Sequence, residues 1–504
     1  MTEELQLTDI QGNIVQAYGR ANFIFARYFF LKINDGEKGR EFLSCILPSI
    51  TTAQLWKNIS GNLQRPTVTT NIAMSYKGLE ALELPLASLN GFPKEFVMGM
   101  QLRKDILGDD GVSDPANWDE IWRQDVHVWL SINGQSKETI EERYQLIASY
   151  VEQTQGGVEI LFGNKGEAGQ TDLPYQDASA IFENGKPTAK EHFGYRDGIS
   201  DPVFQGQNDS SDRVLGRGKL MRDGSWKPLA TGEFILGHPD EAMEYPKAPT
   251  PANLAKNGTF MVYRKLHENV GSFNKFIEEH GKDYPGGKEL LAAKFSGRWR
   301  DNGAPVTKVA SQEQKDEWDK IFYSEDTTDV QRKKMLTDFN YNDDLSGSKC
   351  PLSAHTRRTN PRGSLEFGQD GAFDTPGALT NRRRILRRGL PYGKVDDLTK
   401  DDGEHGIVFM ALNASIERQF EFVQQQWVNY GNDFKEGNDK EVLLGNHQIN
   451  PPSKVVHPVD PDSDDAPYFI GRIPRLVETR GGEYFFVPSM TALSMIADGI
   501  IDPT

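Results

Sequence analysis

FIFARYFFLKI, residues 23–33, decides the fold, because its apolar residues at 23, 25, 29, 31 and 33 follow a period of two. Successive side chains of a β-strand point to opposite faces, so this period predicts a half-buried strand. A helical pattern comes next along the chain. The protein is therefore expected to begin with a strand followed by a helix.

The same order of strand and helix recurs in the first half of the chain. Residues 126–132 (VHVWLSI) are predicted to form a second strand. Ser136 can cap the helix that follows, because serine oxygen accepts a hydrogen bond from a free N–H of the first turn. The apolar residues of that helix fall at spacings of four, three and four, as expected for one buried face: Ile140, Tyr144, Ile147 and Val151.

The second half of the chain repeats this order. Residues 259–266 (TFMVYRKL) precede a helical pattern at Val270, Phe273 and Ile277, and residues 406–412 (GIVFMAL) precede a helix expected over 415–427. The repeat predicts an α+β protein made of duplicated split βαβ units. We therefore expect two ferredoxin-like domains, with antiparallel sheets and flanking helices.

Length and composition set the domain boundary and the class of partner. The chain has 504 residues, more than one hydrophobic core usually organises. An irregular stretch rich in glycine and proline, 216–251, predicts domains at 1–225 and 226–504, and the polar segment 281–349 is expected to be a solvated insertion. A net charge of -16 disfavours nucleic acid and gives no basic footprint for membranes. Small molecules are the expected partners, for a monomer or a homodimer.

The two cysteines and the apolar runs exclude further classes. Cys45 and Cys350 can form at most one bridge and neither lies in a CxxC motif, so a disulfide scaffold and structural zinc are both disfavoured. No stretch approaches 18 apolar residues, which disfavours a membrane span. The chain as given shows no signal peptide.

EHFGYRDGISDP, residues 191–202, places Asp197 between Gly194 and Gly198. An ordinary tight turn accounts for this pattern, because glycine adopts positive φ without strain. A functional interpretation is that the glycines let the backbone pass close to a flat cofactor and direct the carboxylate toward it.

Two basic clusters suggest what that cofactor is. CPLSAHTRRTNPR (350–362) surrounds His355 with arginines, and imidazole is a common proximal ligand of haem iron while guanidinium groups suit its propionates. NRRRILRRGLPYG (381–393) holds five arginines within its first eight residues. Some of these must point inward if the segment is a strand, and a buried arginine needs an anionic partner.

Together the three clusters resemble the dye-decolourising peroxidases, haem enzymes built from two ferredoxin-like domains. The family motif GxxDG is matched by residues 194–198. Four further blocks are similar to family blocks and extend the resemblance over nearly the whole chain, closest to the larger fungal members: DIQGNI (9–14), GEFILG (232–237), NGTFMVYRKL (257–266) and GRWRDNGAP (297–305).

The resemblance implies haem b (iron protoporphyrin IX), held mainly by the C-terminal domain. His355 is the implied iron ligand. The carboxylate that orients its second ring nitrogen is expected to be Glu441, with Asp439 as the second choice. Arg357, two residues after His355, is the implied propionate partner.

On the peroxide side, the resemblance implies that Asp197 moves a proton between the two peroxide oxygens. Arg387, or else Arg388, would stabilise the charge that develops as the bond breaks and an oxoferryl haem forms. Ile407 and Phe409 match the apolar pair that walls this pocket in relatives. Because aspartate stays deprotonated at lower pH than histidine, an acidic optimum is expected.

The resemblance also implies hydrogen peroxide, aromatic dyes and phenols as partners, with substrates oxidised one electron at a time. Trp427 and Tyr392 match surface electron-transfer positions of fungal members. Spacings of four, three and four put Trp427 on a buried helix face, so a surface role requires that it lie at the exposed end of that face. Asp343 and Asp344 are a possible Mn(II) site because carboxylate oxygens suit that ion.

Two other functions fit parts of the sequence. A haem carrier or sensor needs His355 but has no use for Asp197 and Arg387 together. A hydrolase using Asp197 with His192 or His238 lacks an evident nucleophile motif. The resemblance implies an extracellular location, with the cytoplasm as the alternative.

Overall fold

The computed structural model describes residues 4–57, 61–207, 211–366, 377–448, 451–457 and 466–502. Four strands of the first half form an antiparallel sheet in the spatial order β2 (Val68–Met74), β3 (Val128–Gly134), β1 (Phe25–Ile33) and β4 (Val158–Ile160). A fifth strand, β5 (Gln176–Ser179), also pairs with β1. Counted along the chain, the order across the sheet is second, third, first, fourth.

The second half builds its sheet in the same order. Its strands lie as β11 (Leu386–Tyr392), β12 (Gly406–Asn413), β10 (Thr259–Glu268) and β15 (Val477–Val487), and all pairs are antiparallel. This order is again second, third, first, fourth. The predicted α+β fold with two ferredoxin-like units is therefore confirmed, and the duplication extends to the strand topology.

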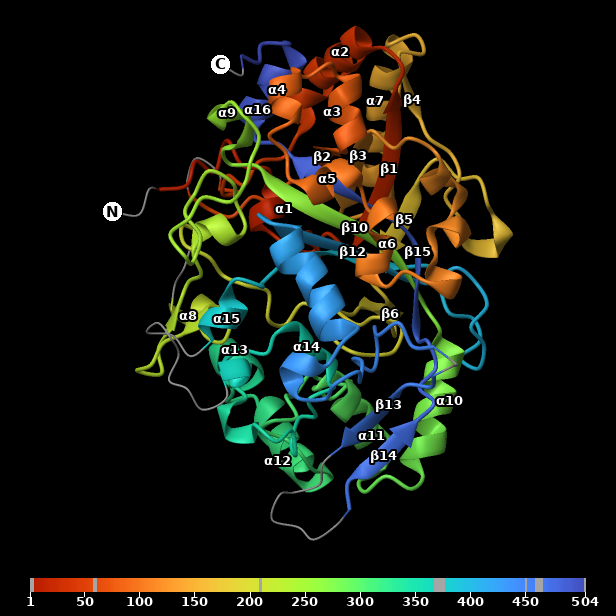
Figure 1. Cartoon of the computed structure of the whole chain (residues 1–504), viewed down its shortest axis with the longest axis vertical. Helices are drawn as coiled ribbons and strands as arrows, with labels where there is room; N and C mark the ends of the chain where they lie inside the picture. The colour runs from red at the N-terminus through yellow and green to blue at the C-terminus, as the bar shows by residue number, and fades with distance from the viewer. Residues whose placement is uncertain are drawn as a thin grey trace.

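The two units share one sheet and one core. A residue pair, Phe486 with Met74, joins β15 to β2, so the two sheets form a continuous nine-stranded sheet. The largest hydrophobic cluster draws on both halves. The last helix, α16 (Met490–Ala497), packs on α2 (Gly36–Ile46) of the first unit, which brings the two ends of the colour scale together in Figure 1.

Strand β1 is buried on both faces, so the prediction of a half-buried strand was wrong. On one face, the Phe29 ring meets Tyr144 of α7 (Lys137–Gln153) at 5.1 Å between centroids. On the other, the Phe30 ring meets Tyr263 of β10 at 5.4 Å. A helix covers one face and the second sheet covers the other, as in a sheet curved back on itself. The helix prediction held: Ser136 caps α7, and the four predicted apolar residues are buried.

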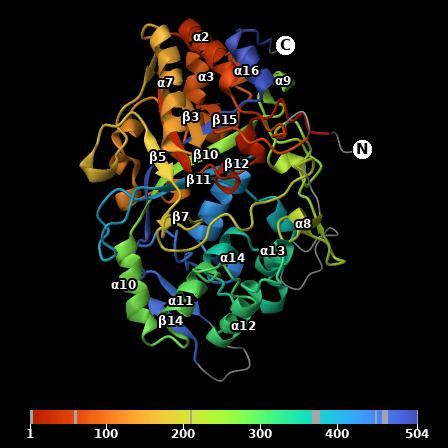
Figure 2. The same ribbon diagram turned by 180° about the vertical axis from the view of Figure 1, so that it is seen from behind.

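A largely helical layer lies below the sheet in the view of Figure 1, while α2, α7 and α16 gather above it, as Figure 2 shows from behind. Its helices are α10 (Val270–Gly281), α11 (Gly287–Ser296), α12 (Gln312–Phe322), α13 (Asp329–Thr337) and α14 (His355–Thr359). The segment predicted as a solvated insertion forms much of this layer. That prediction was wrong for α11, whose residues 290–296 are all buried and pack against α10 and the region before α14.

The helix predicted over 415–427 is present as two π-helical segments, Glu417–Glu421 and Val423–Val428. The remaining helices and strands are short: α1 (Gly12–Val15), α3 (Tyr76–Ala81), α4 (Leu86–Leu89), α5 (Lys94–Met98), α6 (Lys104–Leu107), α8 (Ser211–Val214), α9 (Ala252–Ala255), α15 (Ala378–Asn381), β6 (Phe182–Glu183), β7 (Lys186–Pro187), β8 (Lys219–Leu220), β9 (Trp226–Lys227), β13 (Lys454–His457) and β14 (Tyr468–Gly471). Within the described ranges, no helix has the length and apolar character needed to cross a membrane.

Candidate functional site

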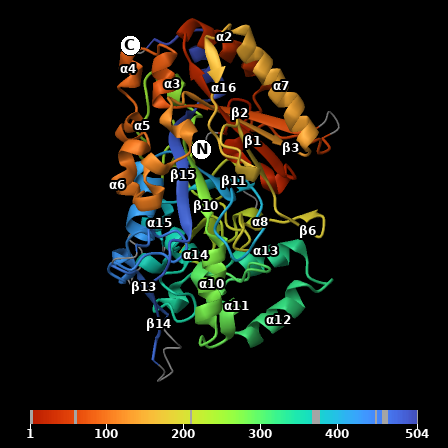
Figure 3. The same cartoon turned by 90° about the vertical axis from the view of Figure 1, so that its right-hand side faces the viewer.

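A cavity of about 910 Å³ lies between the sheet and the helical layer. Strands β11 and β12 contribute Arg387, Ile407 and Phe409 to its wall, and α14, on the helical side of the sheet in Figure 3, contributes His355. The turn that carries Asp197 supplies a further part of the wall. Three stretches singled out by the sequence therefore meet at one cavity, whose size is that of a cofactor site.

The backbone of the turn at residues 191–198 adopts positive φ at both of its glycines. Gly194 and Gly198 have φ of 94° and 77°, which only glycine adopts readily. The Asp197 N–H donates to the Ala189 carbonyl at 2.8 Å, so the backbone on both sides of the carboxylate is fixed. The tight turn and the placement of Asp197 on the cavity wall are the same feature.

Asp197 faces Arg387. Its Oδ1 accepts hydrogen bonds from Arg387 Nη1 at 2.5 Å and from the Gly198 N–H at 2.5 Å. Burial alone would raise the pKa of Asp197, but the charge of Arg387, the Gly198 N–H and Arg20 together hold it below its ordinary value. The carboxylate is therefore ionised and able to accept a proton.

The structure distinguishes Arg387 from its neighbour Arg388. Arg388 is 5% exposed and pairs with the equally buried Asp201 at 3.0 Å. Its other guanidinium N–H groups donate to the Asn13 and Ile14 carbonyls. Arg388 thus holds the fold together, while Arg387 is the arginine that faces Asp197.

His355 begins α14, and its Nδ1 lies 3.5 Å from Oε1 of Glu441. Glu441 is fully buried and also accepts the Leu443 and Leu444 N–H groups. Although burial raises the pKa of a carboxyl group, His355 and these N–H groups keep the pKa of Glu441 below its ordinary value. With Nδ1 turned toward an anion, Nε2 is the ring nitrogen left for a metal.

Of the two carboxylates considered for this role, only Glu441 lies beside His355. The Asp439 carboxylate instead accepts a hydrogen bond from Lys454 at 2.6 Å. The second choice from the sequence is therefore excluded by its contacts.

Arg357 does not line the cavity, so its interpretation as a propionate partner was wrong. Its guanidinium is completely buried, pairs with Asp344 at 3.1 Å and donates to the Cys350 carbonyl at 2.7 Å. Residues two apart on a helix point in different directions, and Arg357 points away from the face of His355. The same pair removes Asp344 as a Mn(II) ligand, and no cluster of three or more potential metal-binding side chains occurs in the described part of the chain.

Three other arginines, which the sequence did not single out, line the cavity without a carboxylate partner among the described residues: Arg298, Arg362 and Arg384. Burial lowers the pKa of each to about 10. Nη2 of Arg384 has no hydrogen-bond partner at all in the described structure. For Arg384, the density of arginine in residues 381–393 was the signal that the sequence offered. These cations suit an anionic ligand.

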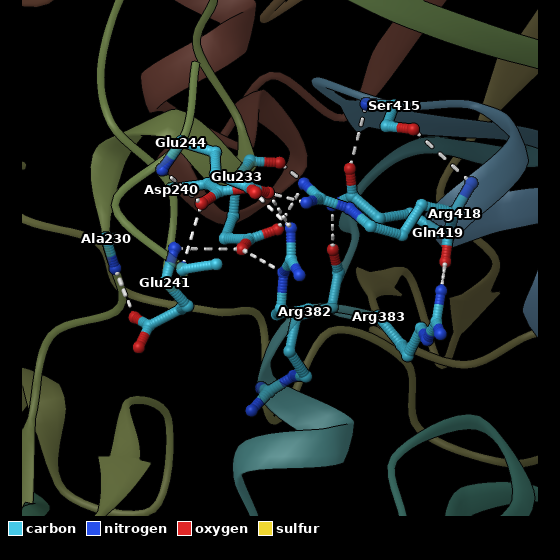
Figure 4. Close-up of polar contacts among 12 residues, drawn as sticks. Ala230, Glu233, Asp240, Glu241, Glu244, Arg382, Arg383, Ser415, Arg418 and Gln419 are labelled. Carbon is cyan, nitrogen blue, oxygen red and sulfur yellow. Dashed lines mark hydrogen bonds and ion pairs between the residues drawn. The ribbon is translucent and has the colours of Figure 1, made fainter. Parts of the chain in front are cut away.

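A buried ion network holds the segment that carries Arg384 (Figure 4). Arg382 and Arg418 both pair with Asp240, at 2.8 and 2.5 Å. Gln419, next to Arg418 on the π-helical segment, donates to the Arg384 carbonyl at 2.6 Å. The start of β11 is thereby fixed relative to the cavity, which positions its arginines.

The two predicted surface electron-transfer residues are buried, so their interpretation as exposed sites was wrong. Trp427 is 2% exposed, and its indole N–H donates to Asp433 at 3.0 Å. Tyr392 is 1% exposed. Trp427 lies on the inward face that the helical spacing indicated, with Phe422 and Phe434 around it.

The hydrolase interpretation finds no support in the geometry. His192 lies 3.0 Å from the Tyr392 carbonyl, and His238 lies 2.9 Å from the Asn257 side chain. Asp197 has Arg387 and the Gly198 N–H as its hydrogen-bond partners instead.

The cavity fits the group that the sequence suggested. It combines a histidine whose Nδ1 faces an anion, apolar walls at Ile407 and Phe409, and the buried Nη2 of Arg384, which has no hydrogen-bond partner among the described residues. A flat, largely apolar molecule with acidic substituents and a metal centre satisfies all of these features.

Comparisons with known proteins agree with this fit. Residues 9–165 match the family model of the DyP dimeric alpha+beta barrel domain, and residues 247–440 match that of the Dyp-type peroxidase C-terminal domain. The chain is 28% identical over 518 residues to a dye-decolorizing peroxidase of Mycetinis scorodonius, with 98% of this chain and 88% of the relative covered. It is 26% identical over 518 residues to a multifunctional dye peroxidase of an Amycolatopsis species, with 97% and 95% covered.

Solved structures show the same fold. The crystal structure of a fungal DyP-type peroxidase from Auricularia auricula-judae superposes with a TM-score of 0.75 at 24% identity, over 98% of this chain and all (100%) of that one. An ancestral D-type dye decolorizing peroxidase superposes with a TM-score of 0.73 at 27% identity, over 97% and 98% of the two chains.

Proposed function

The chain belongs to the DyP-type peroxidases, and on that premise we propose that it binds haem b, reduces hydrogen peroxide and oxidises dyes and phenols by single electrons. The observation that carries the proposal is the Asp197–Arg387 pair, which shares one cavity with His355, whose Nδ1 faces the buried Glu441. Noncovalent haem is supported by the sequence, since neither Cys45 nor Cys350 lies in the C-x-x-C-H motif of attached haem.

His355 would hold the haem iron through Nε2, and Glu441 would keep the imidazole oriented and electron-rich. Bound haem would supply the iron that takes up a peroxide oxygen and the two oxidising equivalents. Arg384 would pair with a propionate in place of Arg357, and Ile407 and Phe409 would wall the peroxide side.

Asp197 would take a proton from one peroxide oxygen and return it to the other. The low pKa that Arg387 helps to impose keeps the carboxylate ready to accept that proton, even in acid. Arg387 would stabilise the negative charge on the departing oxygen. Asp197 is compatible with the acidic optimum that the family resemblance implies, because this base remains ionised where a histidine would be protonated.

The proposed substrate class rests on the names of related proteins and on one related structure. Curated relatives are named dye-decolorizing peroxidases, and a related structure is described as a complex with 2,6-dimethoxyphenol. We propose the same chemical class here, hydrogen peroxide with aromatic dyes and phenols. By the same resemblance we propose an extracellular location.

The experiment is to load the protein with equimolar iron protoporphyrin and add hydrogen peroxide. The proposal expects a ferric haem spectrum that changes within the mixing time and returns when 2,6-dimethoxyphenol is supplied, together with loss of haem binding in His355→Ala. A haem spectrum that peroxide leaves unchanged would identify a carrier or sensor. Failure of the folded protein to bind haem would overturn both the peroxidase proposal and the alternative of a haem carrier or sensor.

A further inference from the structure

Two more carboxyl groups, Glu191 and Glu268, lie on the wall of the same cavity as Asp197. Glu191 opens the turn that carries Asp197, and Glu268 ends β10. They are 9% and 3% exposed, and backbone N–H groups of the same turn bond to both: His192 donates to Glu268, and Phe193 and Tyr195 donate to Glu191. Within the described residues, neither forms an ion pair with a basic side chain. The mechanism derived above uses neither of them.

Such a pair holds one proton. Two adjacent buried carboxylates repel each other, and without a cation beside them both cannot ionise at neutral pH. Burial, and then the charge of Glu191, raise the pKa of Glu268 well above its ordinary value, and burial also raises that of Glu191.

The hydrogen bonds indicate which carboxyl carries the proton. Glu191 accepts the N–H groups of Phe193 at 2.8 Å and Tyr195 at 2.6 Å, and such bonds stabilise the ionised form. Glu268 accepts only the longer bond from the His192 N–H, at 3.3 Å. These contacts favour the proton on Glu268, whose hydroxyl would then donate to Glu191.

The other titratable groups around the pair do not neutralise it. They come from the turn, β10, β11, the residue before β12 and the segment after α11: His192, Tyr195, Asp197, His267, Arg300, Tyr392 and His405. Burial lowers the pKa of His192 and His267 and lowers that of His405 to about 4, so the imidazoles are neutral. Arg300 pairs with Glu289 at 2.5 Å.

We propose that Glu268, with Glu191 as its hydrogen-bond partner, is the proton donor of the cavity and works beside Asp197; this inference rests on the proposed peroxidase function. The two sites have opposite environments. Arg387 keeps Asp197 ionised, whereas the pair Glu268–Glu191 retains a proton. Carboxyl groups whose environments differ in this way divide into a base and an acid.

The reaction consumes protons inside the cavity, and a donor on its wall can deliver them there. Reduction of one peroxide to two waters consumes two electrons and two protons beyond the protons that peroxide brings. The aromatic substrates supply the electrons, one at a time. As an electron arrives, the Glu268 O–H bond breaks, the carboxylate forms, and the proton bonds to the peroxide-derived oxygen. Water then restores the proton to the pair.

The first test is infrared spectroscopy of the haem-loaded protein at neutral pH, without peroxide. The proposal expects a carbonyl stretch of a protonated carboxyl that disappears in Glu268→Gln, shifts in frequency in Glu191→Gln because its hydrogen-bond acceptor has changed, and remains in Asp197→Asn. Glu95→Gln, a buried carboxyl outside the cavity, is the control and should leave that band unchanged. If no band responds to either variant of the pair, the shared proton does not exist. Titration of the wild-type band with pH decides the question even where a variant fails to fold.

The second test separates the two halves of the reaction by stopped flow. Glu268→Gln should react with peroxide as the wild type does, while its return to the resting spectrum with 2,6-dimethoxyphenol slows about 100-fold. A small weak acid in the buffer should restore part of that rate. An unchanged return rate would overturn the proton-donor role. Absence of any peroxide reaction in the wild type would instead refute the proposed function. The infrared result would still report whether Glu268 and Glu191 share a proton, because that test uses no peroxide.

Discussion

Asp197 and Asp201 lie four residues apart and pair with consecutive arginines. The structure nevertheless predicts that replacing each by asparagine has a different effect: Asp197→Asn should impair the reaction with peroxide, and Asp201→Asn should impair stability. The Asp197 side chain is 54% exposed and its partner Arg387 34% exposed. Asp201 and Arg388 are only 6% and 5% exposed. Asp201 also accepts the Arg387 N–H at 2.9 Å, so it fixes the start of β11.

These exposures set the magnitudes. A solvated ion pair contributes at most about 1 kcal/mol, so Asp197→Asn should change the free energy of unfolding by no more than that. Loss of a proton acceptor should slow the reaction with peroxide about 10²- to 10⁴-fold. Removing one partner of a buried pair typically costs about 3–5 kcal/mol, which is the expected destabilisation in Asp201→Asn.

The assay combines denaturant unfolding of each variant without haem, the state to which these exposures belong, with stopped-flow mixing of each haem-loaded variant against peroxide. Asp197→Asn should keep the wild-type midpoint and lose the fast reaction, and Asp201→Asn should unfold much earlier. The reasoning is refuted if Asp197→Asn reacts with peroxide at the wild-type rate, or if Asp201→Asn is as stable as the wild type.

Further outcomes follow from the site. Because Trp427 is 2% exposed, Trp427→Phe should leave the turnover of a bulky anthraquinone dye nearly unchanged at saturating peroxide; a tenfold loss with haem intact would restore Trp427 as an electron-transfer residue. Arg384→Ala should weaken haem binding about tenfold or more in a haem titration, since a charge-assisted hydrogen bond is lost; equal affinity would place the propionates elsewhere. The ionised form of Asp197 is the active one and its pKa lies below the ordinary 3.8, so the reaction with peroxide should already be fast at about pH 4 and should not rise toward about pH 8; a profile that rises over this range would contradict Asp197 as the proton acceptor.

The fold was predictable where local period and long-range packing agree. The apolar spacing of α7 gave its buried face and its cap correctly, because one helix face meets the sheet. The alternation in β1 was misleading, since a second sheet covers the face that the pattern left for solvent. Burial of α11 was missed for the same reason, because its partners are distant in sequence.

The sequence predicted the site residues that lie within a recognisable local pattern. It did not predict those whose position depends on contacts with residues distant in the chain. The pattern of glycines around Asp197 indicated its position, and the density of arginines indicated an anionic ligand. Proximity along the chain misled at Arg357, which lies close to His355 in sequence but turns toward Asp344. Glu268 has no local signal at all, because only the fold brings it to Glu191.

The most direct test of the central claim is a crystal structure of the haem-loaded protein. We expect the iron on Nε2 of His355, with Glu441 at Nδ1 and with Asp197 and Arg387 over the opposite face of the porphyrin. A haem bound outside this cavity, or iron held by another side chain, would contradict the assignment of the site and the peroxide chemistry derived from it.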